Sequence, residues 1–114
     1  MSEQLDIFSR EIIPVPQHCE TIEERAREFF RLNGHVISAF VMLAREYLKK
    51  TGSKHVGAKM LWEKMRFEFA IHTKDDGSGY RLNNNYTAYL ARLVAETHDD
   101  LKDVFEFRRL RSVA

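Results

Sequence analysis

The stretch from His35 to Lys50 constrains the fold most, because its apolar residues recur at helical spacing in two adjacent rows. One row is Val36, Phe40, Leu43 and Tyr47, and its neighbour is Ile37, Val41, Ala44 and Leu48. An apolar face this wide is typical of a helix buried by several neighbours. The sequence therefore predicts a central helix over residues 35–50, which Gly52 ends.

Three further helices are predicted from capping signals and apolar spacing. Thr21 and Glu24 have capping-box spacing, which starts a helix that ends at Asn33-Gly34. The apolar spacing predicts a second helix from Ala58 to about Phe69 and a third from Tyr86 to His98.

Short strands are expected between and after these helices. The segment 53–57 lacks helical periodicity, and residues 104–110 alternate in the manner of a strand. The DDGSG segment at 75–79 is the strongest turn signal in the chain. Its flanks, 70–74 and 80–83, have the spacing of a short hairpin.

From residue 35 onward this order is similar to that of a winged-helix module, whose last helix enters the major groove of DNA. We therefore expect a mainly α fold with a small β component. It would have a winged-helix-like (helix-turn-helix) core plus an extra N-terminal helix. The expected domains are an N-terminal arm over residues 1–20 and a single winged-helix-like domain over residues 21–114.

Two prolines, Pro14 and Pro16, prevent a continuous helix in the arm. The apolar residues Ile12, Ile13 and Val15 leave two alternatives open. Either they dock the arm onto the core, or the arm is a mobile terminus.

Charge is distributed in blocks, although the 114 residues sum to a net charge of only +1. Residues 1–30 hold seven acidic and three basic side chains, net −4, and residues 31–74 hold nine basic and three acidic, net +6. Binding responds to such local patches more than to the total. Duplex DNA thus remains a candidate partner, with modest, salt-dependent affinity.

A cytoplasmic location without membrane insertion is expected. The N-terminal residues are polar and charged, and the longest uncharged run, 32–44, is shorter than the roughly 20 apolar residues that span a bilayer. The single cysteine, Cys19, suits a reducing compartment.

Four strings carry a resemblance over residues 33–112: NGHV, LWEKMRFEFAI, YRLNNNYTAYLARLVAE and FEFRRLRS. The most specific part is LNNNYTAYLARL. On these landmarks the chain resembles a family of small, uncharacterised bacteriophage and prophage proteins. The resemblance implies a phage or bacterial context and no particular activity.

Three consecutive asparagines, Asn83, Asn84 and Asn85, precede the last predicted helix. Asparagine caps helices and tolerates turn geometry, but its amide also reads adenine. Both roles stay open. Thr87, Tyr89 and Arg92 lie off the predicted apolar face, where they would contact phosphates or base edges or form a solvated surface.

Basic residues elsewhere are candidates for a phosphate clamp around this helix. These are Lys54, Lys59, Lys64, Arg81, Arg108, Arg109 and Arg111. Scattered, solvated positions are the alternative.

No signature of catalysis or metal binding is present. The five histidines and one cysteine form no zinc-ligand spacing, and the twelfth residue from Asp75 is Tyr86 rather than the glutamate that closes a calcium loop. Nucleophile and phosphate-loop motifs are also missing. We expect a non-enzymatic protein without cofactor or metal.

Aromatic residues are expected mostly in the core, among them Trp62, Phe67, Phe69, Tyr80 and Phe105. A ring left exposed beside basic residues would instead indicate base stacking or a protein interface.

Two functions are compatible with these features. The first is a non-enzymatic phage-type DNA-binding protein, acting as a homodimer, that docks the helix starting near Asn84 on duplex DNA. The alternative is a helical protein–protein interaction module, an adaptor or inhibitor of a host or phage protein. The apolar arm and the acidic first 30 residues favour the alternative.

Overall fold

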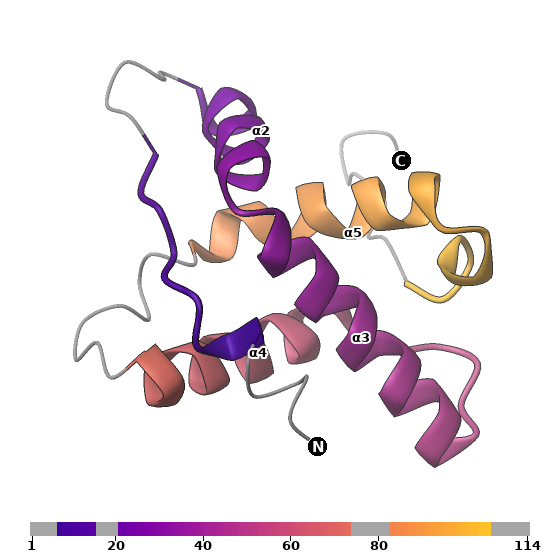
Figure 1. Ribbon diagram of the computed structural model, residues 1–114. Helices are drawn as coiled ribbons and strands as arrows, with labels where there is room; N and C mark the ends of the chain where they lie inside the picture. Colours follow the sequence, from indigo (N-terminus) through magenta and orange to yellow (C-terminus); the bar gives the residue numbers. More distant parts are fainter. Residues whose placement is uncertain (1–6, 16–20, 74–82, 106–114) are drawn as a thin grey trace.

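A computed structural model describes residues 7–15, 21–73 and 83–105, and these are mostly helical. The helices are α2 (Ile22–Leu32), α3 (Gly34–Thr51), α4 (Ala58–Thr73) and α5 (Thr87–Thr97), with 3-10 turns η2 (Asn84–Tyr86) and η3 (Asp99–Leu101). Figure 1 shows α3 running diagonally across the molecule, and α2, α4 and α5 all contact it. The predicted central helix is confirmed, with bounds one residue wider at each end.

Local capping signals are confirmed at the ends of α2 and α3. The Thr21 hydroxyl accepts a hydrogen bond from the Glu24 amide at 3.0 Å, and the Glu24 carboxylate accepts one from the Thr21 amide at 3.1 Å. Gly52 ends α3 with a φ of +72°, which favours glycine because it has no Cβ.

The expected strand at 53–57 is wrong. The Ser53 hydroxyl accepts from the His55 amide at 3.1 Å and donates to the His55 carbonyl at 2.7 Å, so a local turn uses groups that a ladder would need. Val56 donates to the Val104 carbonyl at 3.0 Å, a single tertiary hydrogen bond that does not extend into a ladder among the described residues.

The strand expected from residue 104 is not formed at 104–105. Val104 and Phe105 lie in the turn that follows η3, and both side chains are buried. The Phe105 ring packs against Phe40 of α3 at 5.3 Å between centroids. The rest of that expected strand lies outside the described residues.

The first flank of the expected hairpin is also wrong, because α4 continues through residues 70–73. The Thr73 hydroxyl donates to the Phe69 carbonyl at 2.6 Å, and His72 pairs with Glu68 one turn earlier at 3.2 Å. These contacts between residues four apart prolong the helix up to the described limit. The DDGSG turn and its second flank to residue 82 lie outside the described residues.

The winged-helix-like fold with a small β component is therefore wrong. No strand occurs in residues 7–15, 21–73 or 83–105. Nor is the first helix an addition to a three-helix core, since α2 packs against both α3 and α5 and buries Ala26, Phe29 and Phe30.

Aromatic rings from three elements meet in the core. Phe30 of α2 contacts Trp62 of α4 at 6.4 Å and Tyr86 of η2 at 6.1 Å between ring centroids, and Phe29 contacts Tyr86 at 5.2 Å. Trp62 is fully buried. This cluster joins α2, α4 and the start of α5 into one packed unit.

The described part of the arm, residues 7–15, is docked. It runs along one side of the molecule from α4 towards α2 (Figure 1). Phe8 packs edge-on against Phe69 at 5.0 Å, and both Phe8 and Ile12 are buried, whereas Ile13 is 48% exposed. The alternative in which the arm docks onto the core is therefore correct for these nine residues.

Candidate functional site

Asn83 performs the capping role predicted for one of the three asparagines. Its side-chain Oδ1 accepts a hydrogen bond from the Asn85 amide at 2.8 Å. The next two residues, Asn84 and Asn85, have exposed side chains at the start of the last helical segment. One asparagine is thus structural, and two face solvent.

Two other residues predicted to contact DNA, Thr87 and Tyr89, interact with other residues of this protein. The Thr87 hydroxyl donates to the Asn84 carbonyl at 2.9 Å, across the η2 turn that precedes α5. The Tyr89 ring stacks on Phe30 with a 3° angle between the rings and centroids 5.9 Å apart. The packed alternative therefore describes Tyr89 better than a free base-contacting ring.

A groove between α2 and α5 brings Asn85, Tyr89 and Arg92 together. Its volume is about 570 Å³. Its other lining residues are Ile22, Glu23, Ala26, Ala88, Leu93 and Glu96. The two carboxylates, on opposite helices, offset the one arginine, so this groove does not form a basic clamp.

None of the described members of the predicted basic set, Lys54, Lys59 and Lys64, lines the groove that contains Asn85. Lys54 lies in the connection between α3 and α4, at the lower right of Figure 1, whereas α5 starts at the left. Lys59 follows in the first turn of α4. Arg81, Arg108, Arg109 and Arg111 lie outside the described residues.

A second surface, which the sequence analysis missed, lies on the outer side of α4. Met60, Phe67 and Ile71 are 46%, 60% and 49% exposed, respectively. With Lys64 they are spaced i, i+4, i+7 and i+11, so they form one row on the helix. We call this row the α4 stripe. The spacing was visible in the sequence, but it competed with the stronger row at Leu61, Met65 and Phe69 that faces the core.

The side chain of Lys64 lies beside the ring of Phe67, the aromatic residue of the α4 stripe. The Lys64 ammonium lies 6.0 Å from the centroid of Phe67 and pairs with the Glu68 carboxylate at 2.6 Å. Phe67, which was expected in the core, is thus an exposed ring beside a basic residue, an arrangement that indicates base stacking or a protein interface.

A pocket between α3 and α4 adjoins the stripe. Its volume is about 370 Å³. It is lined by Leu43, Glu46, Tyr47, Lys50, Thr51, Met60, Leu61 and Lys64. Met60 and Lys64 belong to both the pocket and the α4 stripe, so the two form one continuous surface. The Lys50 ammonium pairs with Glu46 at 2.9 Å on the rim.

Among the described residues, a half-buried histidine near the arm, His35, has an unusual environment. The Nε2 atom of His35 is buried without a hydrogen-bond partner, and its ring packs edge-on against Phe69 at 5.7 Å. Burial, reinforced by the positive charge of Arg10, lowers the pKa of His35 below its usual value. No group of three or more His, Cys, Asp or Glu side chains in the described ranges is placed to hold a metal ion.

Comparisons of the chain with protein-family models, curated proteins and solved structures found no match. The resemblance to phage proteins therefore stays a prediction. In the described ranges, no helix has both the length and the apolar character needed to cross a membrane.

Proposed function

We propose that this protein is a non-enzymatic interaction module that binds a partner protein through the α4 stripe. The observation that carries the proposal is the exposure of Phe67, 60%, between two further exposed apolar side chains on one helix face. Single exposed apolar residues are ordinary, but a row of them is typical of a binding surface. Aromatic residues and methionine are also enriched at protein interfaces.

The surroundings of Phe67 favour a protein over a nucleic acid. A base-stacking platform combines its ring with cations that follow the phosphates. Here Lys64 is paired with Glu68, and Arg66 is paired with Glu63 at 3.0 Å. Apolar Met60 and Ile71 continue the surface on either side of the ring, which suits an apolar protein face.

Lysate retention with matched variants tests this function. The full chain is immobilised and exposed to bacterial lysate, and the retained protein is identified by mass spectrometry and then purified. We expect wild type and Ile22→Glu to bind the purified partner, and Phe67→Glu to lose it. Ile22 is the matched control because it is also apolar and exposed, at 42%, but lies on α2. Equal binding by Phe67→Glu and wild type would reject the α4 stripe as the interface.

Duplex DNA is the second candidate partner, supported by the exposed Asn84 and Asn85 at the start of the last helical segment. In this proposal the asparagines contact base edges and Arg92 contributes charge. A homodimer would supply a second set of these contacts. Fluorescence anisotropy at low salt with labelled duplex DNA tests it. Unchanged anisotropy, or full affinity in Asn84→Ala with Arg92→Ala, counts against DNA.

We propose that the protein acts in the bacterial cytoplasm, as the phage resemblance implies. Its single cysteine suits that compartment.

A further inference from the structure

We infer that the partner of the α4 stripe presents an acidic amphipathic helix, because lysines border the apolar surface formed by the stripe and the α3–α4 pocket. This inference rests on the proposed function and names the chemistry of its partner.

The apolar surface has the dimensions of a helix-binding site. From Met60 to Ile71 the stripe covers twelve residues of α4, a rise of about 16 Å along an α-helix. A partner helix of three turns covers the same length and places apolar residues at i, i+3 or i+4, and i+7 along it. The α3–α4 pocket, about 370 Å³ and walled by Leu43, Tyr47 and Leu61, accepts an anchoring side chain from that helix.

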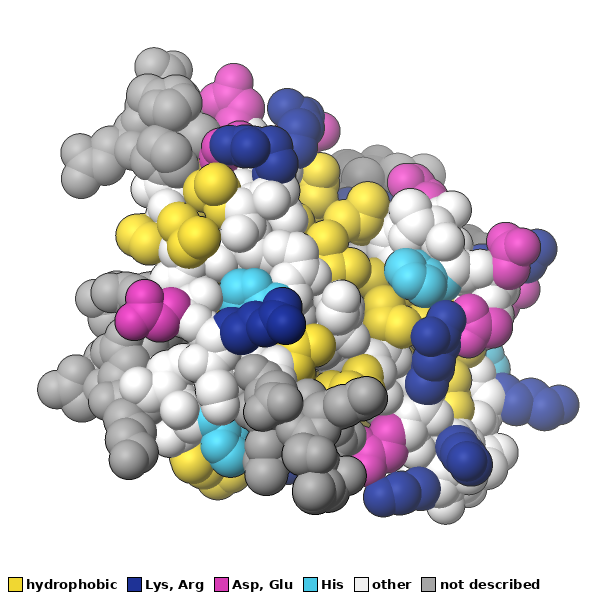
Figure 2. Space-filling view, viewed as in Figure 1, with side chains coloured by type: hydrophobic (Ala, Val, Ile, Leu, Met, Phe, Trp, Pro, Cys, Tyr) yellow, Lys and Arg dark blue, Asp and Glu magenta, His cyan; other side chains and the backbone are white. Residues whose placement is uncertain are grey.

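Positive charge borders one end of this surface. From residue 45 to residue 73 the chain holds seven basic and three acidic side chains, a difference of +4. Figure 2 shows Lys and Arg side chains gathering over the C-terminal end of α3. Exposed Lys49, Lys54 and Lys59 lie at the end of α3, in the connection and at the start of α4, and none forms an ion pair with another described residue. Carboxylates of a partner helix would complement these lysines.

A second copy of this chain is a poorer occupant. A two-fold contact centred on the stripe would place the lysines of each copy beside the C-terminal end of the other copy's α4, where the Glu68 carboxylate is already paired with Lys64 and His72. Helix α2 is not acidic enough to replace a foreign helix, since it carries three glutamates and three arginines.

Two matched peptides test the charge of the partner. Both are synthetic amphipathic helices of equal length with leucine at the same positions, and the polar positions carry glutamate in one and lysine in the other. Each is titrated into the isotope-labelled full chain, and amide chemical shifts are followed by NMR. We expect the acidic peptide to shift amides at Met60, Phe67, Ile71 and Leu43. Its affinity should exceed that of the basic peptide by at least about ten-fold, as charge complementarity alone changes association by this order.

Charge variants localise the effect. The double variant Lys54→Glu, Lys59→Glu should lose most of the preference for the acidic peptide and keep the apolar docking. The control, Arg27→Glu with Arg31→Glu, changes the charge equally but on exposed positions of α2, and should keep the preference.

Several outcomes overturn the inference. They are no binding of the acidic peptide, shifts that map away from the α4 stripe, or equal affinity for the two peptides. Sedimentation velocity showing a dimer that Phe67→Glu dissociates would also overturn it, in favour of a second copy. Any of these results can occur while Phe67→Glu still abolishes binding of the partner purified from lysate. The chemistry inferred for the partner can therefore be wrong while the α4 stripe remains the interface.

Discussion

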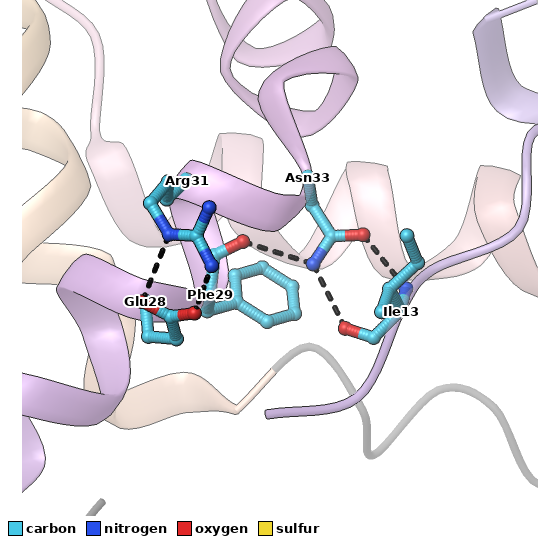
Figure 3. Close-up of polar contacts among 5 residues, drawn as sticks. All are labelled: Ile13, Glu28, Phe29, Arg31 and Asn33. Carbon is cyan, nitrogen blue, oxygen red and sulfur yellow. Dashed lines mark hydrogen bonds and ion pairs between the residues drawn. The ribbon is translucent and has the colours of Figure 1, made fainter. Parts of the chain in front are cut away.

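Asn33 and Ile13, twenty residues apart, exchange a reciprocal pair of hydrogen bonds. The Ile13 amide donates to Asn33 Oδ1 at 2.7 Å, and Asn33 Nδ2 donates to the Ile13 carbonyl at 2.9 Å (Figure 3). Asn33 Nδ2 also donates to the Phe29 carbonyl at 2.9 Å. The fully buried Asn33 side chain thus satisfies the backbone of the arm where it passes the junction of α2 and α3.

Replacing Asn33 should destabilise the protein strongly. Asn33→Ala removes three hydrogen bonds and leaves backbone groups of Ile13 and Phe29 without this partner, so we expect a loss of about 2–4 kcal/mol. Urea denaturation followed by circular dichroism measures it. Asn84→Ala is the control, with an expected change within about 0.5 kcal/mol because that side chain is exposed. Similar urea midpoints for Asn33→Ala and Asn84→Ala would show that docking of the arm contributes little to the stability of the fold.

Stability should fall in mildly acidic solution because of His35. Its pKa is lowered in the folded protein, by burial first and by Arg10 second, with a backbone hydrogen bond at Glu11 opposing them. The unfolded chain then takes up a proton near the ordinary pKa of about 6.5 while the folded protein resists it. The contribution of neutral His35 to the stability of the fold is therefore fully present above that pH, and it decreases as the pH falls below it.

Urea midpoints at pH 7.5 and 5.5 measure this dependence, as approximate values on either side of the ordinary histidine pKa. His35→Gln should show a smaller decrease than wild type, because it cannot take up the proton. His55→Gln is the control and should keep the wild-type decrease, since it leaves His35 in place. An equal decrease in His35→Gln and wild type would assign the effect to other groups.

Truncating two phenylalanines of α4 should change the free energy of unfolding by very different amounts. Phe69→Ala empties a buried site that contacts Phe8 and His35, and we expect it to cost about 3–5 kcal/mol. Phe67→Ala should change the unfolding free energy by no more than about 0.5 kcal/mol, because the ring is largely exposed. Thermal and urea unfolding measure both. A large loss in Phe67→Ala would mean that the ring packs in the fold and is not kept for a partner.

Two glycines at opposite ends of α3 should also differ. At both, an added Cβ meets nothing within 4 Å, but Gly52 has a φ of +72°. Gly52→Ala should therefore cost about 1–2 kcal/mol through backbone strain alone. Gly34→Ala should be neutral or stabilise by up to about 1 kcal/mol, because alanine restricts the unfolded chain. Equal effects on the urea midpoints would contradict the strain argument.

The helices were largely predictable because their signals are local. The capping box at Thr21 and Glu24, the apolar rows of α3 and the αL end at Gly52 each involve residues within a few positions of one another. Their hydrogen bonds need no distant partner. The extension of α4 to Thr73 was missed because the strong turn signal that follows led us to expect a hairpin.

The expected strands failed because strands need partners that a short sequence window does not contain. Segment 53–57 and Val104 do meet, but through one backbone hydrogen bond, while the Ser53 turn and the burial of Phe105 fix the local geometry. For the candidate site, the sequence placed Asn85, Tyr89 and Arg92 near one another on a helix. It did not show that Glu23 of α2 would share their groove.

The sequence by itself determined where α2 begins, where α3 ends and that α3 presents a wide apolar face, because capping contacts and helical spacing depend on residues within one helix. Only the tertiary structure decided which apolar face of α4 is covered, and that Asn33 would bind the arm. Both depend on the neighbours that the packed helices bring together. Met65 and Phe69 face those neighbours and are buried, whereas Phe67 faces away and remains exposed.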